Sequence, residues 1–151
     1  MRDIEIPLYD TSIREIETRF GTSYRKINWN EFSTEYFYEK KGISFSHKQE
    51  DSLRMIYWFN AETNKNVINI ENRIQINQQT KVNEVVEEFG IRTWDYDSTY
   101  NGLIIEYEYF DIIIDLTKED IRWLNKESTS ENWGDLYELF KNHHIKGIEV
   151  Y

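Results

Sequence analysis

The sequence has no cysteine, a single proline, six glycines and three histidines among its 151 residues. Without cysteine the fold depends on neither a disulfide nor a thiolate metal site, and a reducing compartment is allowed. No apolar run approaches the roughly 18 residues of a membrane-spanning helix, and the N-terminus lacks the apolar core of a secretory signal. We therefore expect a cytoplasmic protein with no membrane partner.

Motifs for catalysis are equally scarce. The chain has no G-x-S-x-G nucleophile turn and no glycine-rich phosphate loop, and its basic residues are scattered rather than clustered. His143 and His144 are adjacent, so on a helix their side chains diverge by about 100° and do not share one metal ion. The sequence predicts no enzyme, no cofactor, no metal site and no nucleic-acid partner.

Apolar residues make up 39% of the chain and aromatic residues 16%, a composition that folds around a core. The length is typical of one domain. We expect residues 1–151 to form a single domain.

The negative charge is concentrated in one segment. The formal net charge is -10, and residues 84–120 contain eleven acidic residues against only Arg92 and Lys118. A field of one sign attracts a basic partner and repels nucleic acid and anionic lipid. The alternative is a solvated acidic face that only aids solubility; the composition leaves both interpretations open.

The same segment belongs to a repeat. When the sequence is shifted by 69 residues, Phe20 and Gly21 fall on Phe89 and Gly90, and with no gap the match continues to place Tyr38 on Tyr107, Ile43 on Ile112 and Phe45 on Ile114. Each copy starts with apolar residues at helical spacing and a glycine that ends the helix. Two strand-like segments follow in each copy, whereas the intervening stretch TWDYDSTYNG is expected to be a loop.

These patterns predict an α+β fold. Two tandem βαββ-like units, at 4–59 and 74–116, would form an antiparallel sheet with helices on one face. Strands are also expected at 3–8 and at 67–77, the latter either as one bent strand or as two short ones. The second hairpin is expected to turn near Phe110 and Asp111. Residues 117–151 would add C-terminal helices and a final strand.

Strand alternation then predicts which side chains face away from the core. Ile105 and Tyr107 are expected to point inward, so Glu106 and Glu108 point to the opposite face. By the same alternation Phe37 and Glu39 share that face. Trp58 is expected on a neighbouring strand, where an aromatic beside carboxylates suits a protein interface.

A second group of candidate partner-binding residues comes from the expected loop: Trp94, Asp95, Tyr96 and Asp97. Large aromatic residues between acids in a loop are hard to explain by folding alone.

The repeated pattern T-x-[IV]-x-E-[IV]-x-x-x-F-G, followed by a hairpin such as YFYEKKGISFSH, resembles the tandem units of small cysteine-free immunity proteins in bacterial polymorphic-toxin and contact-dependent secretion systems. It is also similar in plan to the helix-plus-sheet repeats of the β-lactamase inhibitory protein. The resemblance covers residues 4–115 and implies an inhibitor that binds and blocks a cognate protein toxin through its open sheet face.

The acidic second copy favours a toxin with a basic surface, such as a nuclease, with Glu106, Glu108, Asp95 and Asp97 facing its cations. Trp94, Tyr96 and Trp58 would be the anchors. The alternative is a non-catalytic interaction scaffold or regulatory domain. The oligomeric state is left open.

Overall fold

The computed structural model describes residues 12–30, 33–48, 53–59, 67–97, 102–127 and 133–150. Eight strands form one antiparallel sheet in the order β1-β2-β3-β4-β10-β9-β8-β7, and β5 and β6 form a separate two-stranded hairpin. The expected α+β class with an antiparallel sheet is confirmed.

The first half of the sheet is built from one helix followed by four strands. Its elements are α1 (Ile13–Phe20), β1 (Arg25–Asn30), β2 (Ser33–Tyr38), a short 3-10 turn η2 (Glu39–Lys41), β3 (Ile43–Lys48) and β4 (Leu53–Trp58). Ile16 on α1 packs with Tyr38, Phe45 and Met55 of the strands.

The second half has the same order with an insertion. After the hairpin of β5 (Ile68–Ile70) and β6 (Ile74–Ile76) come α2 (Val82–Phe89), β7 (Thr93–Asp97), β8 (Gly102–Glu106) and β9 (Phe110–Ile114). Two helices, α3 (Lys118–Glu127) and α4 (Trp133–Phe140), precede the last strand β10 (Ile145–Val150). They lie between β9 and β10, whereas only residues 49–52 separate β3 from β4 in the first half.

The two halves meet along β4 and β10, which pair antiparallel with Ile56 opposite Glu149. On either side of this pair, Met55 lies opposite Val150 and Tyr57 opposite Ile148. Since each half continues outward from its fourth strand to its first, the sheet has an approximate twofold axis through the Ile56–Glu149 pair.

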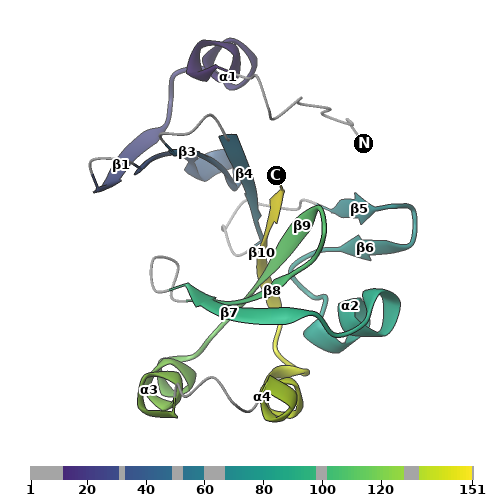
Figure 1. Cartoon of the computed structure of the whole chain (residues 1–151). Coiled ribbons are helices and arrows are strands. Elements are labelled where there is room, and N and C mark those ends of the chain that lie inside the picture. The colour runs from purple at the N-terminus through teal and green to yellow at the C-terminus, as the bar shows by residue number, and fades with distance from the viewer. Residues whose placement is uncertain are drawn as a thin grey trace.

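Helices cover one side of this sheet. Figure 1 shows α1 outside the first half and α3 and α4 outside the second half, so the sheet curves and the side on which no described helix lies is between the halves. Side chains on the helix-covered side form two apolar clusters, one under α1 and a larger one that includes residues of α2, α3 and α4. We call the other side the inner face; its described residues include Phe37, Ser44, Ile56, Trp58, Ile104, Glu106, Asp111, Ile113 and Glu149, and of these only Phe37 and Glu106 are not buried.

The structure corrects the expected plan of the units. The βαββ order is not confirmed: residues 4–11 lie outside the described residues, and β6 pairs with β5 rather than joining the large sheet. The first strand of each half, β1 and β7, was missed because both are edge strands that have few apolar residues. Within the expected loop, residues 93–97 are the strand β7, and residues 98–101 lie outside the described residues.

The second hairpin also differs from the gapless repeat. Tyr36 pairs with Phe45 in the first half, whereas its equivalent Ile105 pairs with Ile112 rather than with Ile114. The second hairpin is thus two residues shorter, which keeps the same side chains on each face because strand side chains alternate with period two. Its turn occupies residues 107–109, ahead of the expected position at Phe110 and Asp111.

Within the described residues, none of the helices has both the length and the apolar character that a membrane crossing requires.

Candidate partner-binding face

One row of residues crosses the inner face from edge to edge. The strand registers place the following residues side by side, from β1 to β7: Arg25, Phe37, Ser44, Ile56, Glu149, Asp111, Glu106 and Thr93. Neighbouring positions in such a row have Cβ atoms about 5 Å apart. The second half therefore presents three carboxylates in succession on β10, β9 and β8.

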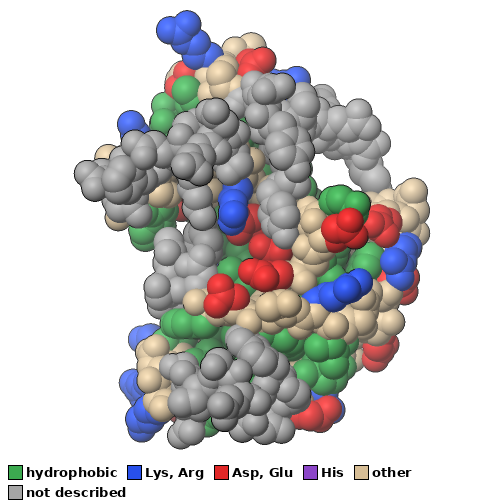
Figure 2. Space-filling view, viewed as in Figure 1, with side chains coloured by type: hydrophobic (Ala, Val, Ile, Leu, Met, Phe, Trp, Pro, Cys, Tyr) green, Lys and Arg blue, Asp and Glu red, His purple; other side chains and the backbone are tan. Residues whose placement is uncertain are grey.

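The twofold axis shows how far the halves have diverged. Glu149, Asp111 and Glu106 occupy the positions that Ile56, Ser44 and Phe37 hold in the first half. The scaffold positions are equivalent, yet one half is acidic where the other is apolar or neutral. Figure 2 shows acidic side chains gathered in the middle of the molecule, between its upper and lower halves.

The carboxylates differ in exposure along the row. Glu149 and Asp111 are buried at 3% and 6% exposure, and Glu106 is exposed. Glu149 accepts from Arg54 Nη1 at 3.1 Å. Asp95 on β7, opposite Ile104, adds a second exposed carboxylate beside Glu106. The negative charge open to a partner is thus at the β8–β7 edge.

An apolar floor adjoins the acidic row. Ile56, Trp58, Ile104 and Ile113 form one buried cluster, against which Phe37 packs. The Trp58 ring meets Phe37 edge-on with 6.4 Å between centroids, and its Nε1 donates to Ser44 Oγ at 2.9 Å. Trp58 is only 8% exposed, so it shapes the floor more than it projects from it.

Basic side chains at this face are already engaged. Arg54 pairs with Glu149, and Arg25 pairs with Glu39 at 2.8 Å while its guanidinium lies 5.4 Å from the Phe37 ring centroid. Lys146 lies 6.0 Å from the centroid of Trp58. These contacts place the cations over the first half and the centre.

The structure brings together Phe37, Trp58, Asp95 and Glu106 of the sequence-predicted residues on the inner face. Glu39 lies at the start of η2, where it is exposed and paired with Arg25. The backbone of Asp97 pairs with Gly102, and its side chain lies outside the described residues.

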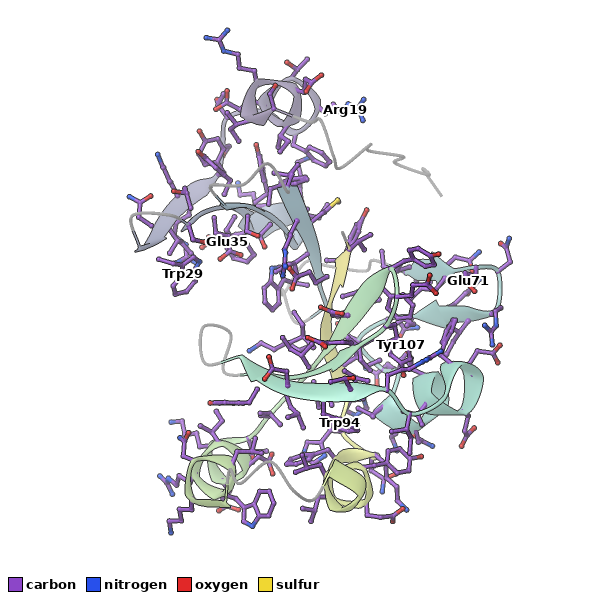
Figure 3. All side chains as sticks on the ribbon, viewed as in Figure 1. Arg19, Trp29, Glu35, Glu71, Trp94 and Tyr107 are labelled. Carbon is purple, nitrogen blue, oxygen red and sulfur yellow. The ribbon has the colours of Figure 1, made fainter. Side chains whose placement is uncertain are left out.

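Trp94 and Tyr96 are placed on the other side of the sheet. Trp94 is 1% exposed and belongs to the large core cluster, against which Tyr96 also packs. Figure 3 shows the Trp94 side chain pointing away from the first half and toward α4. The expectation that Trp94 projects from a loop as an anchor is wrong, because the WDYD segment is a strand with its aromatics turned to the core.

Glu108 is also separated from the inner face, because β8 ends at Glu106. It lies in the β8–β9 turn at a cavity of about 190 Å³, which Arg73, Glu88 and Tyr107 also line. Arg73 contacts two residues of α2: its Nε is 2.7 Å from Glu88 Oε1, and its guanidinium lies 4.3 Å from the Phe89 ring centroid. This cluster joins the β5–β6 hairpin to α2.

Sequence reasoning missed three residues of the inner face. Asp111 and Glu149 were not selected, although both alternate with apolar residues on their strands. Glu35, 3% exposed on β2, accepts a hydrogen bond from Trp29 Nε1 at 2.9 Å. The signal that could have found the first two is the register between strands, which one strand taken alone does not contain.

Comparison with known proteins gives no match: no protein-family model matches the chain, and no curated protein or solved structure matches it significantly.

Proposed function

We propose that this chain is a non-catalytic immunity protein that neutralises a cognate protein toxin by covering a basic region of the toxin with the inner face. The observation that carries the proposal is the row of carboxylates Glu149, Asp111 and Glu106 on a sheet side that no described helix covers. The toxin as partner rests on the resemblance of the repeated sequence pattern to immunity proteins.

Rigid strands hold these groups in place, which favours binding. Glu149 and Asp111 are buried and already have partners, so they add to the negative field of the face rather than contact a toxin cation directly. The exposed pair Glu106 and Asp95 would steer the encounter at low salt. Occlusion requires only this fit and no chemical step.

A scaffold or regulatory domain is the second candidate, and a separate surface favours it. Trp123 on α3 and Leu139 on α4 are 40% and 52% exposed and line a cavity of about 300 Å³ with Phe140, Glu119 and Asp120. This site, which combines apolar and acidic side chains, lies on the outer side of the sheet. A scaffold that joins two partners would use both surfaces, whereas an inhibitor needs only the inner face.

The test is protection of growth. If a neighbouring gene encodes a secreted protein with a toxic domain, the chain is co-expressed with that domain, and the complex is quantified by calorimetry at two salt concentrations. The inner-face variant E106K/D95K is compared with E87K/E119K, which reverses two exposed charges on α2 and α3. We expect the first to lose protection and to bind at least about 10-fold more weakly at low salt, and the second to behave as wild type.

Equal protection by both variants would refute the inner face as the site. Absence of protection by the wild-type chain would refute immunity and leave the scaffold. In that case W123A/L139A should impair association, with the outer helices still folded by circular dichroism.

A further inference from the structure

Trp29 is an exposed aromatic side chain that is held in one orientation. It is 43% exposed on the edge strand β1, and its indole nitrogen donates to the buried Glu35 carboxylate at 2.9 Å. The pairing of β1 with β2 is irregular between Asn28 and Asn30, at Trp29 itself. Such an irregularity re-aims a side chain, and Figure 3 shows Trp29 and Glu35 on the same side of the first half, toward the second half.

The cost of this arrangement indicates a use for it. Burying a carboxylate is unfavourable unless the group is bonded, and Trp29 leaves 43% of its surface in water, which forgoes part of the stability that full burial of an indole would give. The Trp29–Glu35 pair therefore fixes an apolar surface in advance. Fixed, partly exposed tryptophans are the typical anchors of protein interfaces because little conformational entropy is lost when they bind.

The two ends of the inner face differ in chemistry. Trp29 and Phe37 lie on the first half, whereas the exposed carboxylates Glu106 and Asp95 lie on the second. From β1, which carries Trp29, to β8, which carries Glu106, the sheet crosses six strand spacings, about 29 Å along its surface, which the curvature shortens. One helix of about 19 residues covers that length.

We propose that the inner face binds one segment that is apolar at one end and basic at the other, with Trp29 as the apolar anchor and the Glu106–Asp95 edge as the cation site. The inference rests on the proposed function for its biological partner but concerns the chemistry of the bound segment. A uniformly basic segment would use only half of the face.

The experiment uses two synthetic helical peptides of about 18 residues, about 27 Å long. Both carry the same number of lysines at one end; the other end is rich in leucine in the first peptide and in glutamine in the second. Titrations use the full chain labelled with 5-fluorotryptophan, in which each of the five tryptophans gives one fluorine resonance. Resonances are assigned with single Trp→Phe variants.

We expect the leucine-containing peptide to bind at least about 10-fold more tightly than the glutamine peptide and to shift the Trp29 resonance, while the core Trp94 resonance stays in place. Trp29→Ala should remove this preference and leave the salt dependence unchanged. E106K/D95K should lower the affinity for both peptides and flatten the salt dependence. A tenfold loss corresponds to about 1.4 kcal/mol.

Trp29→Phe is a second variant for the case in which Trp29→Ala does not fold. It keeps an aromatic ring at this position and loses the hydrogen bond to Glu35. Urea unfolding checks that each variant is folded. The proposal is overturned if neither peptide binds, if both bind equally to the wild type, or if a folded Trp29→Ala variant keeps the preference. These results are independent of toxin protection, so failure of this inference and failure of the immunity proposal are distinguishable.

Discussion

Trp58 lies against Gly147 where the two halves of the sheet meet. A Cβ atom at residue 147 would come within 3.2 Å of Trp58 Cε3 and 3.0 Å of the Tyr57 carbonyl oxygen. The glycine lets the indole lie across β10, and so the floor of the inner face depends on the absence of one methyl group.

Gly147→Ala should therefore destabilise the protein by about 1–3 kcal/mol, because overpacking forces the strand or the ring to move. Urea unfolding of the variant measures this loss. In a Trp58→Leu background the same substitution should cost less, since only the contact with the Tyr57 backbone remains. An equal cost in both backgrounds would show that the ring is not the obstacle.

Tyr38 and Tyr107, which occupy equivalent positions in the two halves, lead us to expect a loss of stability at alkaline pH. Tyr38 donates its hydroxyl to Gly21 O at 2.8 Å, and Tyr107 donates to Gly90 O at 3.0 Å, 69 residues further along the chain. Burial raises the pKa of both hydroxyls from 10.0 to about 12, because it disfavours the phenolate. The folded state therefore binds these protons more tightly than the unfolded chain does.

A raised folded-state pKa contributes stability that is complete below pH 10 and is lost as the pH rises toward 12. Y38F/Y107F should be less stable at pH 8 by about 1 kcal/mol for each lost hydrogen bond. Its stability should fall less steeply than that of wild type between pH 10 and 12. An unchanged slope in Y38F/Y107F would show that these two hydroxyls do not account for the alkaline loss of stability.

The contacts of Asp120 predict that the folded state loses stability at acidic pH. Its burial opposes ionisation, but bonds from the Thr117 hydroxyl and backbone N–H, both at 2.7 Å, and from His143 hold the pKa of Asp120 below its usual 3.8. A lowered folded-state pKa gives stability that is present above pH 3.8 and is lost as the pH falls through the folded value.

Asp120→Asn should lower stability at pH 6 by about 1 kcal/mol, because it weakens the cap at the start of α3. The loss of stability between pH 5 and 2 should be shallower than in wild type. Denaturant midpoints across this range measure both effects. Glu119→Gln removes a neighbouring exposed charge and should change neither; if it matches Asp120→Asn, the effect is general electrostatics rather than the cap.

The β5–β6 turn offers a stabilising change. Glu71 and Asn72 have φ of 52° and 56°, a left-handed conformation at both central positions of the turn that the Arg73 N–H closes by donating to Ile70 O at 2.9 Å, within a three-residue loop. Asn tolerates this conformation better than Glu. Glu71→Asn should raise the unfolding free energy by about 0.5–1 kcal/mol, measured in urea. A decrease would mean that the Glu71–Arg73 ion pair, at 3.5 Å, contributes more than the backbone gains.

The repeated helices were predictable because their signals are local. Ile16 and Phe20 recur at equivalent places as Val85 and Phe89, and Gly21 and Gly90 both take positive φ at the helix ends. Alternation also assigned Glu106 to the correct face. These properties depend on residues within one helix or strand.

What was missed depends on distant partners. The edge strands β1 and β7 have polar or acidic sequences that resemble loops, although Trp94 and Tyr96 do alternate as strand residues do. Asp111 becomes a neighbour of Glu106 only through the register of the β8–β9 hairpin, and Glu149 joins them through the pairing of β9 with β10, which is distant in the chain. Charge counted along the sequence therefore locates only part of the acidic surface of the inner face. Asp95, Glu106 and Asp111 come from the acidic segment 84–120, and Glu35 and Glu149 come from outside it.

The joint between β4 and β10 has a consequence for the origin of this asymmetry. An antiparallel pair centred on a twofold axis has the geometry of an isologous contact, the kind that joins two identical subunits. In such a homodimer every substitution appears twice, so both halves of the inner face must stay alike. Two copies fused in one chain escape this constraint, and one copy is free to gain carboxylates while the other keeps its aromatic surface.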